Sequence, residues 1–92
     1  MPYMLVRIRL VDFDWWRAVF DDPEQIEIRT AYGCLGTRVF RSVDNPSEVV
    51  LLMEWGDIDG AKEYGISDEL RLAMGRSGGS DRPSIHFLDE VG

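Results

Sequence analysis

The sequence predicts an α+β fold in which helices cover one face of a four-stranded antiparallel sheet. Residues 48–55 form the longest nearly unbroken apolar run, and turn residues bound it on both sides. Eight residues is the length of a strand rather than a helix, so this run predicts a central strand with both faces covered. Two stretches with helical spacing each separate strands, which gives the order β-α-β-β-α-β. We expect a single domain over residues 1–92.

The first strand and the first helix are indicated by a change in periodicity. Apolar side chains alternate through residues 3–11, as in a strand. Asp12 can cap the helix that follows, because a short carboxylate accepts hydrogen bonds from the free amides of a first turn. Three aromatic side chains then share one helical face: Phe13, Trp16 and Phe20. Trp15 lies beside Trp16 in the sequence, so we expect one of these two indoles at the surface.

This helical stretch is interrupted at Asp22. With Asp22 as its N-cap and Pro23 at its first position, a second helical piece is predicted to begin there. It is expected to run to about Tyr32. Gly33 can then adopt the left-handed conformation that ends many helices.

The second half of the chain repeats the pattern. A strand is predicted at residues 34–42, and a hairpin-length connection at residues 43–47 leads into the apolar run. Right-handed crossovers then place both helical stretches on the same side of the sheet, with the first and third strands in the middle. This arrangement is the ferredoxin-like plait.

The second helical stretch is also expected in two pieces. Asp57 can cap the first piece, which stalls at Gly65, and Ser67 can cap the restart. A glycine- and serine-rich loop is predicted at residues 75–81. The last strand is predicted at residues 83–91.

Side chains alternate between the two faces of a strand, and residues 48–55 are apolar on both faces. The sequence therefore predicts that something covers each face of the sheet. One phase contains Val49, Leu51, Met53 and Trp55, and the other contains Val50 and Leu52. Helices can cover only one face, so the other phase, beside Leu5, would leave an apolar patch in water. A second copy of the sheet is an economical cover, so we expect a homodimer through the sheet face. From the sequence, either phase could face the helices.

The composition is that of a small, acidic, packed domain. The 92 residues are 45% hydrophobic, and seventeen acidic against ten basic residues give a net charge of −7. This charge disfavours binding to nucleic acid or an anionic membrane, so we expect neither partner. Cys34 is the only cysteine, which fits a reducing compartment. The sequence contains no signal-peptide pattern and no apolar run of about 20 residues, so a soluble cytoplasmic protein is expected.

Short stretches along the whole chain match the pattern of a known family. They are Asp12-Phe13-Asp14-Trp15, Gly33-Cys34-Leu35-Gly36, Val39-Phe40-Arg41, Asp44-Asn45-Pro46 leading into residues 48–55, Ala61, Ser67-Asp68-Glu69-Leu70 and the strand after Pro83. In these stretches the chain resembles the dimeric α/β-barrel proteins, and specifically the small domains of the antibiotic-biosynthesis monooxygenase group.

The resemblance implies a homodimer whose two sheets pack as a barrel, with a mostly apolar cavity in each subunit between sheet and helices. Such families include cofactor-independent oxygenases for polycyclic aromatic substrates, haem-degrading enzymes and isomerases. Some catalytic members carry a histidine where this chain has Tyr64. The haem-degrading members use an asparagine in the first strand, where this chain offers Arg7 or Arg9. Both departures count against haem degradation, and no cofactor is expected.

Two side chains are candidates for catalysis. His86, the sole histidine, alternates with apolar neighbours in the last strand and could act as a general base near neutral pH. The alternative is a structural or exposed histidine. Tyr64 could donate a hydrogen bond to a bound carbonyl, or it could simply fill the space between helix and sheet.

Seven apolar side chains are candidates for the wall of a flat, aromatic-ligand pocket, with ordinary core packing as the alternative. They are Trp16, Phe20, Phe40, Met53, Trp55, Leu70 and Met74. No metal site is expected, because one histidine and one cysteine are too few for zinc.

The sequence thus favours a small dimeric enzyme similar to the cofactor-independent monooxygenases, acting on an apolar aromatic or polyketide-like molecule. Tyr64 or His86 would polarise an oxygen atom of the substrate. A non-catalytic dimeric module that binds a small molecule or has a structural role is the alternative. Haem binding is a third hypothesis.

Overall fold

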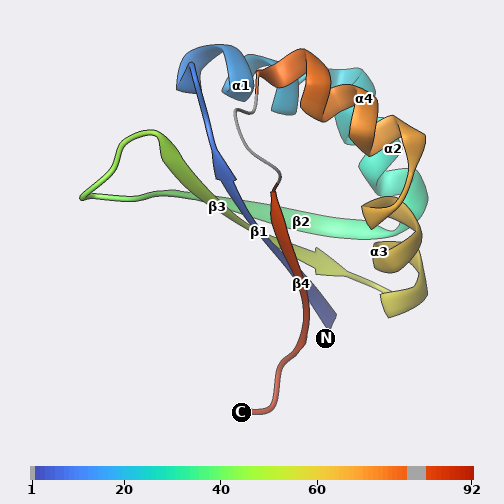
Figure 1. Ribbon diagram of the computed structural model, residues 1–92. Helices are drawn as coiled ribbons and strands as arrows, with labels where there is room; N and C mark the ends of the chain where they lie inside the picture. The colour runs from blue at the N-terminus through green and yellow to red at the C-terminus, as the bar shows by residue number, and fades with distance from the viewer. Residues whose placement is uncertain (1, 79–82) are drawn as a thin grey trace.

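The computed structural model describes residues 2–78 and 83–92 of the chain (Figure 1). Its elements, in chain order, are β1 (Pro2–Arg9), α1 (Phe13–Phe20), α2 (Pro23–Tyr32), β2 (Cys34–Arg41), β3 (Glu48–Trp55), α3 (Ile58–Gly65), α4 (Asp68–Ser77) and β4 (Ser84–Asp89). The predicted α+β class is confirmed, with each helical stretch divided into two helices.

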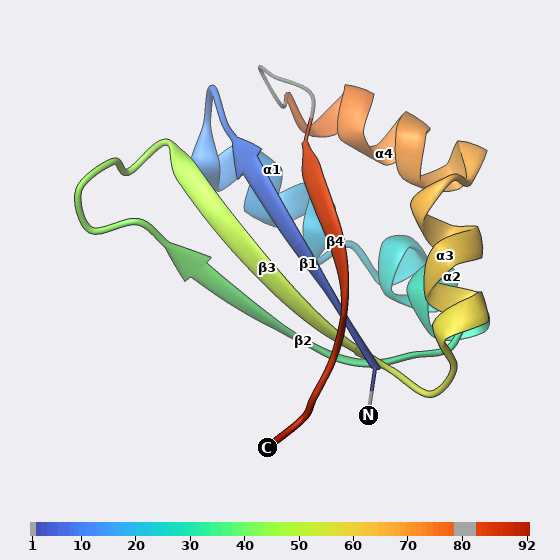
Figure 2. The same cartoon turned by 60° about the horizontal axis from the view of Figure 1, so that its bottom comes forward.

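The four strands form one antiparallel sheet in the order β2-β3-β1-β4. The prediction that the first and third strands lie in the middle is therefore confirmed. Both views show the four helices on one side of the sheet, while the opposite face is left without a helical layer (Figures 1 and 2). We call the helix-covered face the inner face and the uncovered face the outer face.

Strand β3 shows which apolar phase faces the helices. Its buried side chains are Val49, Leu51, Met53 and Trp55, and the alternate ones, Val50, Leu52 and Glu54, are only half-buried. In the sheet, Leu51 lies between Val6 of β1 and Val39 of β2. The centre of β3 therefore supplies the middle of the core.

Strand β2 begins with an irregularity that changes its phase. Cys34 pairs with Trp55, yet Gly36 pairs with Glu54, so Leu35 is an extra residue between the two pairs. An extra residue of this kind is a β-bulge, and it moves every later side chain to the opposite face.

The helix starts follow the predicted caps. The Asp12 carboxylate accepts from the Trp15 amide at 3.1 Å, and Asp22, Asp57 and Ser67 cap α2, α3 and α4. Gly33 ends α2 with φ at 109°, a value that favours glycine. Trp16 is buried and Trp15 is 55% exposed, which confirms that one of the two indoles lies at the surface.

The end of α4 differs from the prediction. Residues 75–77 are the last turn of α4 rather than part of a loop, and Gly78 ends the helix in the left-handed conformation. The indole nitrogen of Trp15 donates to the Arg76 carbonyl at 2.7 Å, which satisfies a carbonyl at the helix end and ties α4 to α1. Residues 79–81 of the predicted loop lie outside the described residues.

Three strands are shorter than predicted. β1 ends at Arg9. The amide of Leu10 still bonds to the Ser47 carbonyl at 2.7 Å, as the next pair of the same register, but Val11 is 77% exposed. β2 ends one residue early, and β4 is shorter at both ends.

Candidate functional site

A small cavity lies between the inner face of the sheet and the helices. Apolar side chains of β1, β3, α1 and α4 form most of its wall. Polar groups come from Gln25 and Arg29 of α2 and from Tyr64 of α3. An apolar wall with a few convergent polar groups is typical of small-molecule sites. We call this space the inner cavity.

The inner cavity has a volume of about 40 Å³. One water molecule occupies about 30 Å³ of liquid, and a cavity of about 150 Å³ holds benzene. The protein's own side chains therefore fill most of the space between sheet and helices. A ligand with an aromatic ring needs part of the wall to move.

Helix α4 is the part of the wall with the shallowest packing. None of its described side chains is buried, and Leu70, Ala73 and Met74 reach the cavity while half-buried. Besides its contact with Trp15, α4 is held by a hydrogen bond of 2.5 Å from the Tyr32 hydroxyl to the Glu69 carboxylate. We therefore regard α4 as the cover of the inner cavity.

Five of the seven predicted ligand-binding residues line the inner cavity: Trp16, Phe20, Met53, Leu70 and Met74. The Trp16 and Phe20 rings stack at 5.0 Å between centroids, with 18° between their planes. The two rings therefore make an aromatic part of the wall in which one ring stacks on the other.

Phe40 and Trp55 lie elsewhere. The bulge in β2 places Phe40 beside Val50 on the outer face, where it is 51% exposed. Trp55 is fully buried against Tyr64, with the ring centroids 5.5 Å apart, and it does not line the cavity. The indole nitrogen of Trp55 has no hydrogen-bond partner among the described residues.

Tyr64 is buried in the wall of the inner cavity, as a ligand-contacting role requires. Burial raises the pKa of its phenol, and the nearby Arg29 lowers that pKa by a smaller amount, through its charge and as a hydrogen-bonding partner. The net shift is upward, so the hydroxyl stays protonated at neutral pH and can act as a donor.

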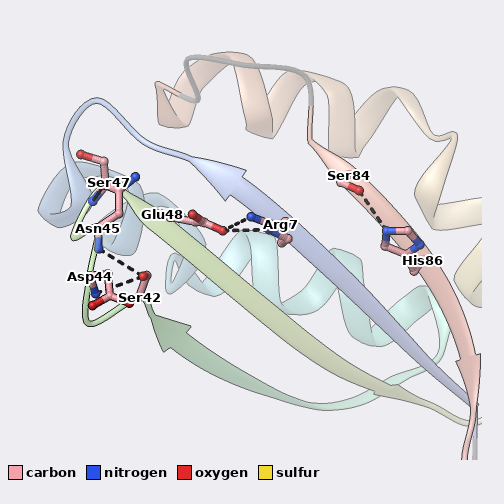
Figure 3. Close-up of polar contacts among 8 residues, drawn as sticks. All are labelled: Arg7, Ser42, Asp44, Asn45, Ser47, Glu48, Ser84 and His86. Carbon is pink, nitrogen blue, oxygen red and sulfur yellow. Dashed lines mark hydrogen bonds and ion pairs between the residues drawn. The ribbon is translucent and has the colours of Figure 1, made fainter.

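His86 lies on the opposite side of the sheet from Tyr64. It pairs with Leu5 on the outer face and is exposed, with its Nε2 3.0 Å from the Ser84 hydroxyl oxygen (Figure 3). The two predicted catalytic residues are therefore not brought together. On the same face, the Nε of Arg7 donates to the Glu48 carboxylate at 2.8 Å (Figure 3).

Two polar residues of the cavity wall, Gln25 and Arg29, were not among the predicted site residues. Each is 6% exposed. A signal was present in the sequence, because Gln25, Ile28, Arg29 and Tyr32 recur at the spacing of one helical face. Ile28 and Tyr32 pack against the core, so the polar pair on the same face had to point inward.

Cys34 lies close enough to Arg29 for the charge of Arg29 to affect its thiol. Its thiol is 3.5 Å from the Gly36 carbonyl oxygen, and burial raises its pKa, which the charge of Arg29 partly offsets. A thiol of this kind is a weak nucleophile. Over residues 2–78 and 83–92, no group of three His, Cys, Asp or Glu side chains is arranged to hold a metal ion.

Comparison with known proteins places this geometry in a family. The family model for antibiotic biosynthesis monooxygenases matches residues 13–76, which is more than half of the chain. The chain belongs to the antibiotic biosynthesis monooxygenase family. Among curated proteins, no relative gives a significant match.

Solved structures of antibiotic biosynthesis monooxygenases share the fold of this family member. A protein of that description from Bordetella bronchiseptica has a TM-score of 0.77 and 18% identity, covering 98% of this chain and 96% of its own. One from Caulobacter crescentus CB15 has a TM-score of 0.75 and 20% identity, and the match covers 99% of this chain and 90% of the Caulobacter chain. At these identities the similarity establishes the ferredoxin-like fold alone.

A third similar structure carries a ligand. It is a monooxygenase of Streptomyces coelicolor in complex with nanaomycin D, with a TM-score of 0.73 and 19% identity, covering 99% of this chain and 88% of its own. No helix among the described residues of this family member is long and apolar enough to cross a membrane.

Proposed function

We propose that this protein is a cofactor-independent monooxygenase that acts on an apolar aromatic or polyketide-like small molecule in the inner cavity. Membership of the family carries the proposal. The Trp16 and Phe20 rings in the cavity wall support an apolar aromatic substrate. The similar monooxygenase in complex with nanaomycin D supports a substrate of this class.

The chemistry would be the oxidation of a hydroxylated ring to a quinone. The ring loses two hydrogen atoms and gains one oxygen atom, which is a four-electron oxidation. Dioxygen supplies that oxygen atom and accepts the four electrons, and its second oxygen leaves with the two hydrogens as water. In this reaction Tyr64 would donate a hydrogen bond to the substrate oxygen, while the apolar wall excludes water.

Oxygen uptake tests the proposed reaction. We expect the wild-type protein, with 1-naphthol, air and a metal chelator, to consume one dioxygen per quinone formed. Tyr64→Phe should lower kcat by at least about tenfold, since a positioned donor contributes at this scale or more. Tyr3→Phe is the matched control, because its hydroxyl lies on the outer face and bonds to Glu90. Absence of oxygen uptake by a wild-type protein that binds 1-naphthol would contradict catalysis.

A non-catalytic binding module is the second candidate, favoured by the position of His86. With His86 on the outer face, the described wall of the inner cavity contains no histidine or carboxylate to act as a base. A binding module predicts that 1-naphthol binds without turnover, and that Tyr64→Phe changes only its affinity.

We also propose a homodimer through the outer face of the sheet. Leu5, Val50 and Leu52 are half-buried there, and Phe40 and Leu88 are 51% and 41% exposed. Side chains of this kind in one sheet face form an apolar patch that a monomer would leave in water. A second copy of the same face would cover it with two-fold symmetry.

Sedimentation tests the dimer. The wild-type protein should sediment at twice the monomer mass at micromolar concentration, and Leu52→Asp should sediment as a monomer. A carboxylate at this position would lose its hydration in the contact, and that cost opposes association even with Arg38 directly across the strand pair. A wild-type protein of monomer mass at that concentration would refute the proposal.

A further inference from the structure

Arg29 is a buried charge in the wall of the inner cavity. The residue is 6% exposed, and its guanidinium carbon lies 4.0 Å from the centroid of the Phe20 ring. An arginine side chain keeps its positive charge in proteins. Burying a charge is unfavourable unless an opposite charge or several hydrogen bonds accompany it. The question is therefore whether the residues around Arg29 supply an opposite charge.

The neighbours of Arg29 are neutral. The ion pairs formed within residues 2–78 and 83–92 join other side chains, and none involves Arg29. The Phe20 ring offers a π-face to the guanidinium, and Tyr64 lies in the same cavity wall. A guanidinium presents five N–H donors in a planar fork that matches an anionic oxygen group. Within the described part of the chain, an aromatic face, and no carboxylate, therefore accompanies this charge.

The other groups of the cavity wall define the rest of the ligand. Gln25, one helical turn before Arg29, is a neutral polar neighbour, and the remaining wall is apolar apart from Tyr64. We propose that the inner cavity binds an aromatic ligand with one ionised oxygen group, a carboxylate or an ionised phenol, and that Arg29 pairs with that group. This inference rests on the ligand position in the proposed function but needs no oxygen-transfer reaction.

Arg29, and not the overall charge of the protein, would attract the anionic group of the ligand. The whole chain carries a net charge of −7, which repels anions at long range. Arg17 lies over the same Phe20 ring, at 5.9 Å from its centroid, but its side chain is 43% exposed and pairs with Asp21. Arg17 is therefore a matched control for a positive charge near the same ring and outside the cavity wall.

Two ligands of equal shape test the charge selection. 2-Naphthoate is ionised at pH 7.5, while 2-naphthamide has the same rings and is neutral. We expect calorimetry to show that the wild-type protein binds 2-naphthoate at least tenfold more tightly. Arg29→Met should abolish this preference, Arg29→Lys should retain part of it, and Arg17→Met should leave it unchanged. Thermal melting should show that Arg29→Met is folded, because it removes a buried charge without a charged partner.

The outcomes separate this inference from the proposed function. Equal affinity of the wild-type protein for the two ligands would overturn charge selection and leave an aromatic-binding cavity standing. Loss of the preference in Arg17→Met, with the preference kept in Arg29→Met, would place the anion outside the cavity and also overturn it. If neither ligand binds, both the anion site and the aromatic-ligand part of the proposed function fail. Preference for 2-naphthoate without any oxygen uptake would support the anion site alone.

Discussion

Replacing Leu51 with aspartate is expected to leave the chain unfolded at 25 °C. Leu51 is 3% exposed at the centre of the sheet, between two other strands. A carboxylate there would be desolvated beside the apolar side chains of Val6 and Val39, and burying a charge in such surroundings costs several kcal/mol. Domains of this kind are stable by about 5–15 kcal/mol in total, and small ones lie at the low end. Circular dichroism should show loss of the native spectrum.

The next residue provides the control. Leu52 is half-buried on the outer face, so Leu52→Asp should retain the native spectrum and a cooperative melting transition. The two substitutions differ only by one position in the same strand, and the alternation of side chains decides their outcome. Equal damage by both would contradict the assignment of the two phases.

Gly60→Ala is expected to destabilise the protein by about 3 kcal/mol, at the upper end of the usual range for overpacking. A Cβ atom on Gly60 would clash with the carbonyl oxygen of Tyr32, at the end of α2. This contact is with backbone, so α2 and α3 would have to separate. Because Tyr64 is on α3 and Arg29 on α2, the separation would also disturb the polar wall of the inner cavity. Urea unfolding measures the change.

Gly75→Ala is the matched control. Gly75 lies inside α4, and a Cβ atom there would meet no other atom within 4 Å. Alanine favours a helix interior over glycine by roughly 0.5–1 kcal/mol, so this variant should be more stable than the wild type. If Gly60→Ala is as stable as Gly75→Ala, α2 and α3 do not pack as closely as described.

The sheet could be predicted because its signals are local. The two apolar phases of residues 48–55 and the caps at Asp12, Asp22 and Ser67 depend on neighbouring residues in the chain. The end of α4 could not be predicted from local signals. The glycines near it predict a loop, but a hydrogen bond from Trp15, which is distant in the sequence, helps to hold the last turn.

The candidate site was predictable only in part. Phe40 was expected in the pocket, but a bulge in β2 that strict alternation does not reveal turns it to the outer face. His86 is separated from Tyr64 by the thickness of the sheet. Arg29 went unrecognised because charged residues in helices usually face water, and only its helical spacing with core residues indicates the opposite.

The shallow packing of α4 also has a kinetic consequence. If a ring-sized ligand enters only when α4 swings outward, the rate of association has an upper limit set by the opening of α4, whatever the ligand concentration. The observed affinity is then the intrinsic affinity multiplied by the fraction of molecules with α4 open. Because α4 has no buried side chain among its described residues, this opening costs little of the core. Under that condition, a movement of α4 would let the inner cavity exchange ligands while the rest of the core stays packed.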